Sequence, residues 1–212
     1  MITPTHLGDH NYIKPRSFGT LIDLQYADDI CWVGGNCNHE VEFFKKNIPE
    51  YLAPRNLMIN PTKTEEYEIH KETDEWKKCR YLGSLLDSEE DIKRRRLLAK
   101  ISYDKIRPAL EDKKLDNEIK ISIFNTMISS VFLYNSEIWT TTKGMEEAID
   151  TYQRTNLRRI LNIRYPRKIT NEMLYNAANQ KPWSQILKMR RLNCFGHMAR
   201  LPDEMTPQPN LL

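Results

Sequence analysis

Long apolar runs are missing from this 212-residue chain, in which 40% of the residues are hydrophobic and 29% are charged. No stretch reaches the roughly 18 apolar residues that a membrane-spanning helix needs. Residues 1–16 are polar where a secretory signal would carry an apolar segment. We therefore expect no membrane association and an intracellular location, nuclear or cytoplasmic. The length allows one sizeable core or two small ones.

Closely spaced cysteines are missing as well. No Cys-x-x-Cys pair of the kind found in zinc ribbons and redox sites is formed by the four cysteines, which are Cys31, Cys37, Cys79 and Cys194. Cys194 and His197 have the spacing of two metal ligands, but a tetrahedral zinc site needs two more and none is close in sequence. We expect reduced thiols, and we favour packing over zinc binding for Cys194.

Acidic residues are scarce near the carboxyl end. Residues 151–200 contain 11 basic residues and one acidic residue, Glu172, which gives +10 (11 minus 1), while the rest of the chain has 21 basic and 28 acidic residues, which gives −7. The two values sum to the net charge of +3. This asymmetry indicates a polyanionic partner for residues 151–200, and the alternative is a basic surface that is only solvated.

The amino-terminal part has the pattern of short strands. Residues 20–33 suit two strands that meet at a tight turn, and the glycines that follow end the second one. Residues 40–51 have the spacing of a helix. Beyond a proline turn, Tyr67 and Ile69 alternate as in a strand, and 79–86 is the last strand-like stretch.

After residue 88 the apolar spacing becomes helical, so the sequence as a whole predicts an α+β fold. Ser88 and Asp91 suit the start of a first helix, and Pro108 is expected to bend or end it. Asp116 suits the start of a second helix. Further helices are expected at about 144–162, 170–179 and 183–195.

Two adjacent carboxylates, Asp28 and Asp29, occupy the turn of the hairpin, in the string Tyr26-Ala27-Asp28-Asp29. Such a pair by itself is most often the polar turn of a hairpin. The repulsion between the two anions would be removed by Mg²⁺, which prefers oxygen ligands and takes one or two protein carboxylates together with water and phosphate.

The string Leu24-Gln25-Tyr26-Ala27-Asp28-Asp29-Ile30 resembles the palm hairpin of reverse transcriptases of the LINE type, the non-long-terminal-repeat retroelements. The later stretch from Leu57 to Thr64 resembles the next palm block. Tyr81-Leu82-Gly83 is similar to the hairpin that grips the primer terminus. The resemblance covers about residues 20–205.

Further blocks continue the resemblance downstream. Leu133-Tyr134-Asn135-Ser136-Glu137-Ile138-Trp139 is similar to a block found after the thumb in many of these proteins, although Asn135 stands where the family commonly has glycine. Shorter matches begin at Arg158, Thr170 and Arg190. The blocks after the first are specific mainly as an ordered set.

The resemblance implies roles for the palm residues. Asp28 would be the principal metal ligand and Asp29 the auxiliary one, for Mg²⁺ or alternatively Mn²⁺. Tyr26 would pack near the primer end, and Lys63 could donate a proton to departing pyrophosphate, although a lysine after a proline turn is more often only solvated. The partners implied are an RNA template and a DNA primer.

The family's fingers and the strand with its first catalytic aspartate have no counterpart before Leu21. Phosphoryl transfer needs two cations about 3.5 to 4 Å apart, which Asp28 and Asp29 alone would not hold. We therefore expect an inactive fragment of an RNA-directed DNA polymerase with incompletely coordinated metal. Self-association through exposed palm surface is expected too.

The division that follows is a partial palm at 1–87, a helical thumb at 88–142 and a basic helical region at 143–212. One alternative function is a non-catalytic nucleic-acid-binding module, and a weaker one is a polymerase completed by a second chain. Nucleic-acid contacts are expected from the hairpin residues Tyr26, Tyr81, Leu82 and Gly83 and from the basic residues Arg154, Arg158, Arg159, Arg164, Arg167, Lys168, Arg190 and Arg191.

Overall fold

The computed structural model describes residues 22–26, 29–33, 45–50, 52–69 and 72–200. These residues form several helices and two small antiparallel sheets, which confirms the predicted α+β class. The chain forms two compact units that divide between Glu66 and Tyr67.

The first unit contains the predicted hairpin. Strands β1 (Ile22–Tyr26) and β2 (Asp29–Val33) pair antiparallel, and the register runs from Ile22 opposite Val33 to Tyr26 opposite Asp29. The predicted turn itself, residues 27–28, lies outside the described residues. Residues 45–50 are helical, which agrees with the second half of the predicted helix, and the short 3-10 helix η2 (Ala53–Arg55) follows.

The strand predicted around Tyr67 and Ile69 is wrong. Residues 65–69 have no regular secondary structure, and Ile69 is 64% exposed. Alternating side chains alone do not make a strand, which also requires a regular ladder of backbone hydrogen bonds with a neighbouring strand.

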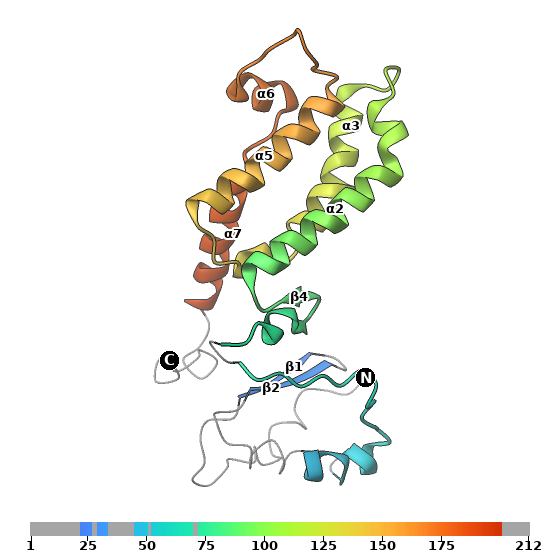
Figure 1. Cartoon of the computed structure of the whole chain (residues 1–212), viewed down its shortest axis with the longest axis vertical. Coiled ribbons are helices and arrows are strands. Elements are labelled where there is room, and N and C mark those ends of the chain that lie inside the picture. Colours follow the sequence, from blue (N-terminus) through green and yellow to red (C-terminus); the bar gives the residue numbers. More distant parts are fainter. Residues whose placement is uncertain (1–21, 27–28, 34–44, 51, 70–71, 201–212) are drawn as a thin grey trace. The chain divides into compact units, whose positions relative to one another are not determined.

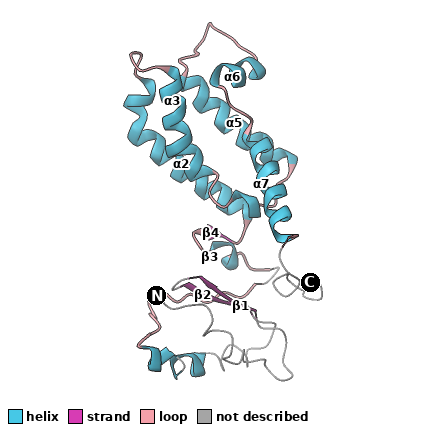
Figure 2. Cartoon of the chain, turned by 180° about the vertical axis from the view of Figure 1, so that it is seen from behind, coloured by secondary structure: helices cyan, strands magenta, loops and turns pink. Residues whose placement is uncertain are grey.

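The second unit begins with a short hairpin and continues as a helical bundle (Figures 1 and 2). The 3-10 helix η3 (Glu75–Lys78) precedes strands β3 (Arg80–Tyr81) and β4 (Ser84–Leu85). The helical elements after them are α2 (Ser88–Glu111), α3 (Asn117–Phe124), the π-helical turn η4 (Asn125–Ser129), α4 (Ser130–Phe132), the 3-10 helix η5 (Ser136–Ile138), α5 (Lys143–Ile160), α6 (Asn171–Ala178) and α7 (Trp183–Met198).

The core of this unit is built around Trp183, which is completely buried. Its ring stacks on Phe132, with 4.5 Å between the ring centroids, and on Phe124 at 5.9 Å. These three residues come from α7, α4 and α3. Aromatic rings bury large areas, so this cluster holds the three helices together. Trp183 thus has a packing role.

Helix α2 starts differently from the prediction. Asp87, one residue earlier than expected, is its N-cap and accepts a 2.9 Å hydrogen bond from the Glu90 amide. The helix continues past Pro108 to Glu111. Asp116 does precede α3, as predicted, and the three later helices lie where they were expected.

The regions predicted as thumb and basic tail share one hydrophobic core, which includes Leu110, Ile128, Leu157 and Leu187. The hairpin β3–β4 belongs to the same compact unit as these helices. None of the helices among the described residues is long and apolar enough to cross a membrane, in agreement with the expectation from the sequence.

Candidate functional site

The palm-like hairpin is described only in part. Asp29 is exposed at the start of β2, opposite Tyr26, whereas Asp28 lies outside the described residues. No group of three or more His, Cys, Asp and Glu side chains that could hold a metal ion occurs among the residues that the structure describes. Metal binding by Asp28 and Asp29 therefore stays a prediction.

Lys63 lies on a turn that Asn60 organises. The Asn60 side-chain oxygen accepts hydrogen bonds from the Thr62 amide at 3.1 Å and the Thr62 hydroxyl at 2.7 Å, and the Lys63 amide donates to the Asn60 carbonyl at 3.1 Å. Such side-chain contacts are typical of asparagine before a proline turn. The Lys63 side chain is exposed, as are the apolar side chains of Leu57 and Met58 earlier in the same segment.

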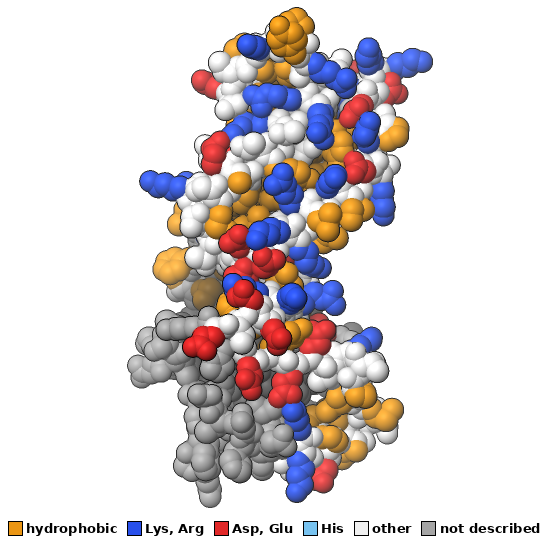
Figure 3. All heavy atoms as spheres, in the orientation of Figure 1, with side chains coloured by type: hydrophobic (Ala, Val, Ile, Leu, Met, Phe, Trp, Pro, Cys, Tyr) orange, Lys and Arg blue, Asp and Glu red, His pale blue; other side chains and the backbone are white. Residues whose placement is uncertain are grey.

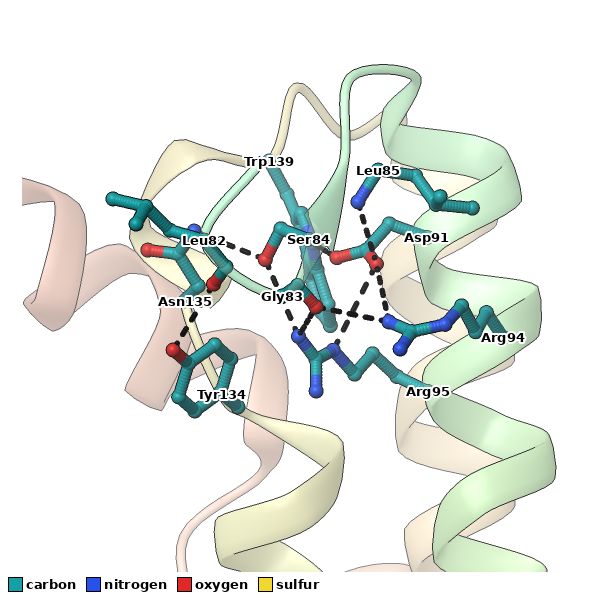
Figure 4. Close-up of polar contacts among 10 residues, drawn as sticks. All are labelled: Leu82, Gly83, Ser84, Leu85, Asp91, Arg94, Arg95, Tyr134, Asn135 and Trp139. Atoms are coloured by element: carbon teal, nitrogen blue, oxygen red, sulfur yellow. Dashed lines mark hydrogen bonds and ion pairs between the residues drawn. The ribbon is translucent and has the colours of Figure 1, made fainter. Parts of the chain in front are cut away.

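The primer-grip-like hairpin turns at Leu82 and Gly83. Both residues have positive φ angles, 46° and 78°, which is the geometry of a two-residue hairpin turn. Leucine rarely adopts such a φ angle, so the turn needs support from its surroundings. Residues from α2 and from the segment around η5 supply it (Figure 4), and α7 supports that segment in turn.

The first support comes from α2. The Gly83 carbonyl accepts hydrogen bonds from Arg94 Nη1, at 2.9 Å, and from Arg95 Nη2. Arg95 is only 6% exposed, and it also lies 3.3 Å from Ser84 Oγ. Burial lowers the pKa of Arg95, and Asp91 opposes this shift. The Gly83 carbonyl thus provides two of the contacts that stabilise these charged groups.

Asp91 is the acidic centre of this cluster, and it is fully buried. Its carboxylate accepts hydrogen bonds from the Leu85 amide at 3.1 Å and from Trp139 Nε1 at 2.9 Å. Arg94 and Arg95 lie 3.6 and 3.7 Å from Asp91 Oδ1. One carboxylate therefore joins strand β4, helix α2 and the segment after η5.

The second support comes from the block Leu133–Trp139. Tyr134 donates its hydroxyl hydrogen to the Leu82 carbonyl at 3.1 Å, and Asn135 Nδ2 donates to Ser84 Oγ at 3.0 Å. The Arg95 guanidinium lies over the Tyr134 ring, 4.4 Å from its centroid. Asn135 has a φ of 55°, a left-handed conformation that glycine and asparagine tolerate best. This geometry explains why asparagine can stand where the resembling family commonly has glycine.

The third support comes from α7. Arg190 donates to the Leu133 carbonyl and, at 3.3 Å, to Ser136 Oγ, while Arg191 donates to Thr141 Oγ1 at 2.7 Å. Three blocks that are far apart in the sequence therefore meet. We call this cluster the hairpin junction, and it consists of Leu82, Gly83, Ser84, Asp91, Arg94, Arg95, Tyr134, Asn135, Trp139 and Arg190.

Apart from Tyr26, whose side chain lies outside the described part of the chain, the predicted nucleic-acid contacts fall into two groups. The residues of the first group make contacts within the protein. Arg154 contacts Glu147, Arg158 donates to Asn171 at 2.8 Å, and Arg190 and Arg191 contact the segment 133–141. The Leu82 and Gly83 carbonyls are likewise engaged, and Tyr81 is half-buried in β3. The polar groups of these residues are therefore engaged mainly in contacts that stabilise the fold.

The second group points outward. Arg159, Arg164, Arg167 and Lys168 are all exposed. Arg164 is 3.8 Å from Glu111, a long ion pair, and within the described part of the chain no acid lies within 4 Å of Arg159, Arg167 or Lys168. We call these four residues the outward cations. Figure 3 shows Lys and Arg side chains spread over the helical unit and interspersed with hydrophobic ones.

Sequence reasoning missed Asp91, Arg95 and Trp139 as a structural centre. In the sequence, Asp91 has the spacing of a helix start and Trp139 belongs to the block that begins at Leu133. Their spacing of 48 residues carries no local signal.

Comparison with known proteins finds a similar chain, an uncharacterized transposon-derived protein of Caenorhabditis elegans. The two are 22% identical over 205 residues, a match that covers 86% of this chain and 73% of the nematode protein. No protein-family model matches the chain. No solved structure matches it either.

Proposed function

We propose that this chain is part of a retroelement protein of the reverse transcriptase type and that its helical unit binds nucleic acid through the outward cations. Two findings support the lineage. The similar nematode protein is transposon-derived, and the blocks that resemble the family contact one another in the hairpin junction.

The observation that carries the binding proposal is the separation of the basic residues into two groups. Between Asp150 and Glu172 there are six basic residues and no acidic one. Arg154 and Arg158 form hydrogen bonds within the helical unit. The positive charge presented to solvent therefore comes from Arg159, Arg164, Arg167 and Lys168. Among these four cations only Arg164 has an acid within 4 Å in the described part of the chain. Exposed cations with so few acidic neighbours favour contact with a phosphate backbone, whose binding releases condensed counterions.

The polymerase chemistry of the lineage would use Asp28 and Asp29 with Mg²⁺ or Mn²⁺, an RNA template and a DNA primer. We propose no catalysis by residues 1–212 alone, since a two-metal site needs a further carboxylate from a neighbouring strand. Binding by the helical unit does not require that chemistry.

Fluorescence anisotropy with labelled duplex and single-stranded 20-mers tests the proposal. We expect the purified chain to bind both at low salt and to lose affinity steeply as salt rises, with little dependence on sequence. Absence of binding at low salt would contradict the proposal.

A further inference from the structure

The loop between α5 and α6, residues 161–170, carries an exposed aromatic side chain. Tyr165 is 87% exposed, against 71% for Phe195 and 49% for Tyr134. Both ribbon views show this loop projecting beyond the helices (Figures 1 and 2). Because the ring buries so little surface within the chain, packing does not account for an aromatic residue here.

The charges beside Tyr165 are all positive. Arg164 precedes it, Arg167 and Lys168 follow one residue later, and the Arg167 amide donates to the Arg164 carbonyl at 2.9 Å, which turns the loop back on itself. The Arg164 side chain is 68% exposed in spite of its long ion pair with Glu111. An aromatic ring and three cations are thus presented by one short loop.

A polar pocket of about 410 Å³ borders the same loop. Asn162 lines it together with Lys113, Lys120 and Asn117 at the start of α3, and Glu111 and Asp116 are its acidic residues. Lys120 is 4% exposed and has no ion pair among the described residues. Glu111 forms ion pairs with both Arg107 and Arg164, with N···O distances of 3.5 and 3.8 Å. With two lysines and two acids the pocket lining is formally neutral, so the positive charge of this region comes from the loop residues Arg164, Arg167 and Lys168.

This combination distinguishes between two forms of nucleic acid. In a duplex the faces of the bases are stacked on one another and only the edges and the phosphates are accessible. In a single strand each base has a free face, and an aromatic side chain flanked by cations binds it by stacking while the cations contact the phosphates.

We infer that residues 162–168 are a single-strand-binding loop in which Tyr165 stacks on a base and Arg164, Arg167 and Lys168 contact the adjacent phosphates. The inference rests on the proposed nucleic-acid binding and gives it a preferred ligand. Base identity should matter little, because every base has a face on which a ring can stack.

The test uses the full chain, a labelled dT 20-mer and a duplex of the same length. Tyr165→Ala should weaken binding of the single strand about tenfold and binding of the duplex by less than twofold, and Tyr165→Phe, which keeps the ring, should bind like wild type. Phe195→Ala is the matched control, since Phe195 is another exposed aromatic residue, 71% exposed, on α7. It should leave both affinities unchanged.

Salt dependence separates stacking from charge. Tyr165→Ala should keep the wild-type slope of log affinity against log salt, whereas Arg164→Gln with Arg167→Gln and Lys168→Gln should reduce it by about two, at about 0.7 per phosphate contact on a single strand. Wild-type single-strand affinity in Tyr165→Ala, or an equal loss with Phe195→Ala, would overturn the inference while leaving nucleic-acid binding intact. If the wild-type chain binds no nucleic acid, both the single-strand inference and the proposed nucleic-acid binding are overturned, whether or not the chain binds anionic phospholipid vesicles.

Discussion

Trp139 Nε1 donates a 2.9 Å hydrogen bond to Asp91 Oδ2, and the two side chains are 3% and 0% exposed. The bond joins the first turn of α2 to the segment after η5, 48 residues further along the chain. Asp91 also holds the Leu85 amide. One buried carboxylate therefore links the hairpin β3–β4 to two segments of the bundle, in addition to the contacts of Arg94, Arg95, Tyr134 and Asn135.

Removing that carboxylate should destabilise the helical unit. We expect Asp91→Ala to lower the free energy of unfolding by about 3 kcal/mol, because it leaves the Trp139 indole and the Leu85 amide without their acceptor and the buried Arg95 guanidinium without its ion-pair partner. Urea denaturation measures the change. Asp104→Ala, on an exposed position of the same helix, is the control and should stay within about 0.5 kcal/mol of wild type. Equal stability of the two variants would show that the junction contributes nothing.

The turn of the hairpin should resist a side chain at Gly83. We expect Gly83→Ala to cost about 1 kcal/mol, since its φ of 78° is unfavourable for alanine, although a Cβ would meet the Tyr134 ring at an ordinary 3.7 Å. Gly144→Ala is the control, because Gly144 lies in helix α5, where alanine is the better residue. Thermal unfolding of both variants checks the prediction, and a higher melting temperature for Gly83→Ala than for Gly144→Ala would be inconsistent with it.

Tyr103 should make stability fall at alkaline pH. Burial, and next the nearby Glu111 carboxylate, raise the pKa of Tyr103 to about 12. The unfolded chain loses this proton near pH 10, so between pH 10 and 12 the folded state holds more protons than the unfolded state. The stability that the protonated Tyr103 hydroxyl contributes is complete below pH 10 and is lost as the pH rises to 12. Tyr103→Phe should flatten this part of the unfolding free-energy profile, and an unchanged profile would contradict the assignment.

Much of the helical fold could be predicted from the sequence, because the spacing of apolar residues after Ser88 is set by which face each helix buries. The hairpin junction could not. Asp91 looks like a helix-capping residue, and its partner Trp139 is supplied only by tertiary packing. The division of the basic residues into two groups could not be predicted either, since Arg158 contacts Asn171 only because the α5–α6 loop brings α6 back to α5.

Nucleic-acid binding should not require a divalent metal. With EDTA at constant ionic strength we expect the affinity to be unchanged or slightly higher than with Mg²⁺, and Asp29→Asn should have no effect or strengthen binding slightly, because it removes an exposed negative charge. Anisotropy titrations with and without Mg²⁺ decide this. A Mg²⁺-dependent affinity that disappears in Asp29→Asn would instead place the palm-like hairpin at the centre of binding.

The salt dependence of duplex binding in two charge-matched variants tests the account most directly. One variant replaces three outward cations, Arg159, Arg167 and Lys168, by Gln. The other replaces three lysines that are ion-paired with acidic neighbours, Lys77 with Asp74, Lys93 with Glu89 and Lys188 with Glu146.

Both variants lose three positive charges, so net charge alone would affect them equally. We predict that the slope of log affinity against log salt becomes less steep by about 2.7 in the outward variant, at about 0.9 for each lost phosphate contact, and stays close to wild type in the ion-paired variant. Equal slopes in the two variants would contradict the account.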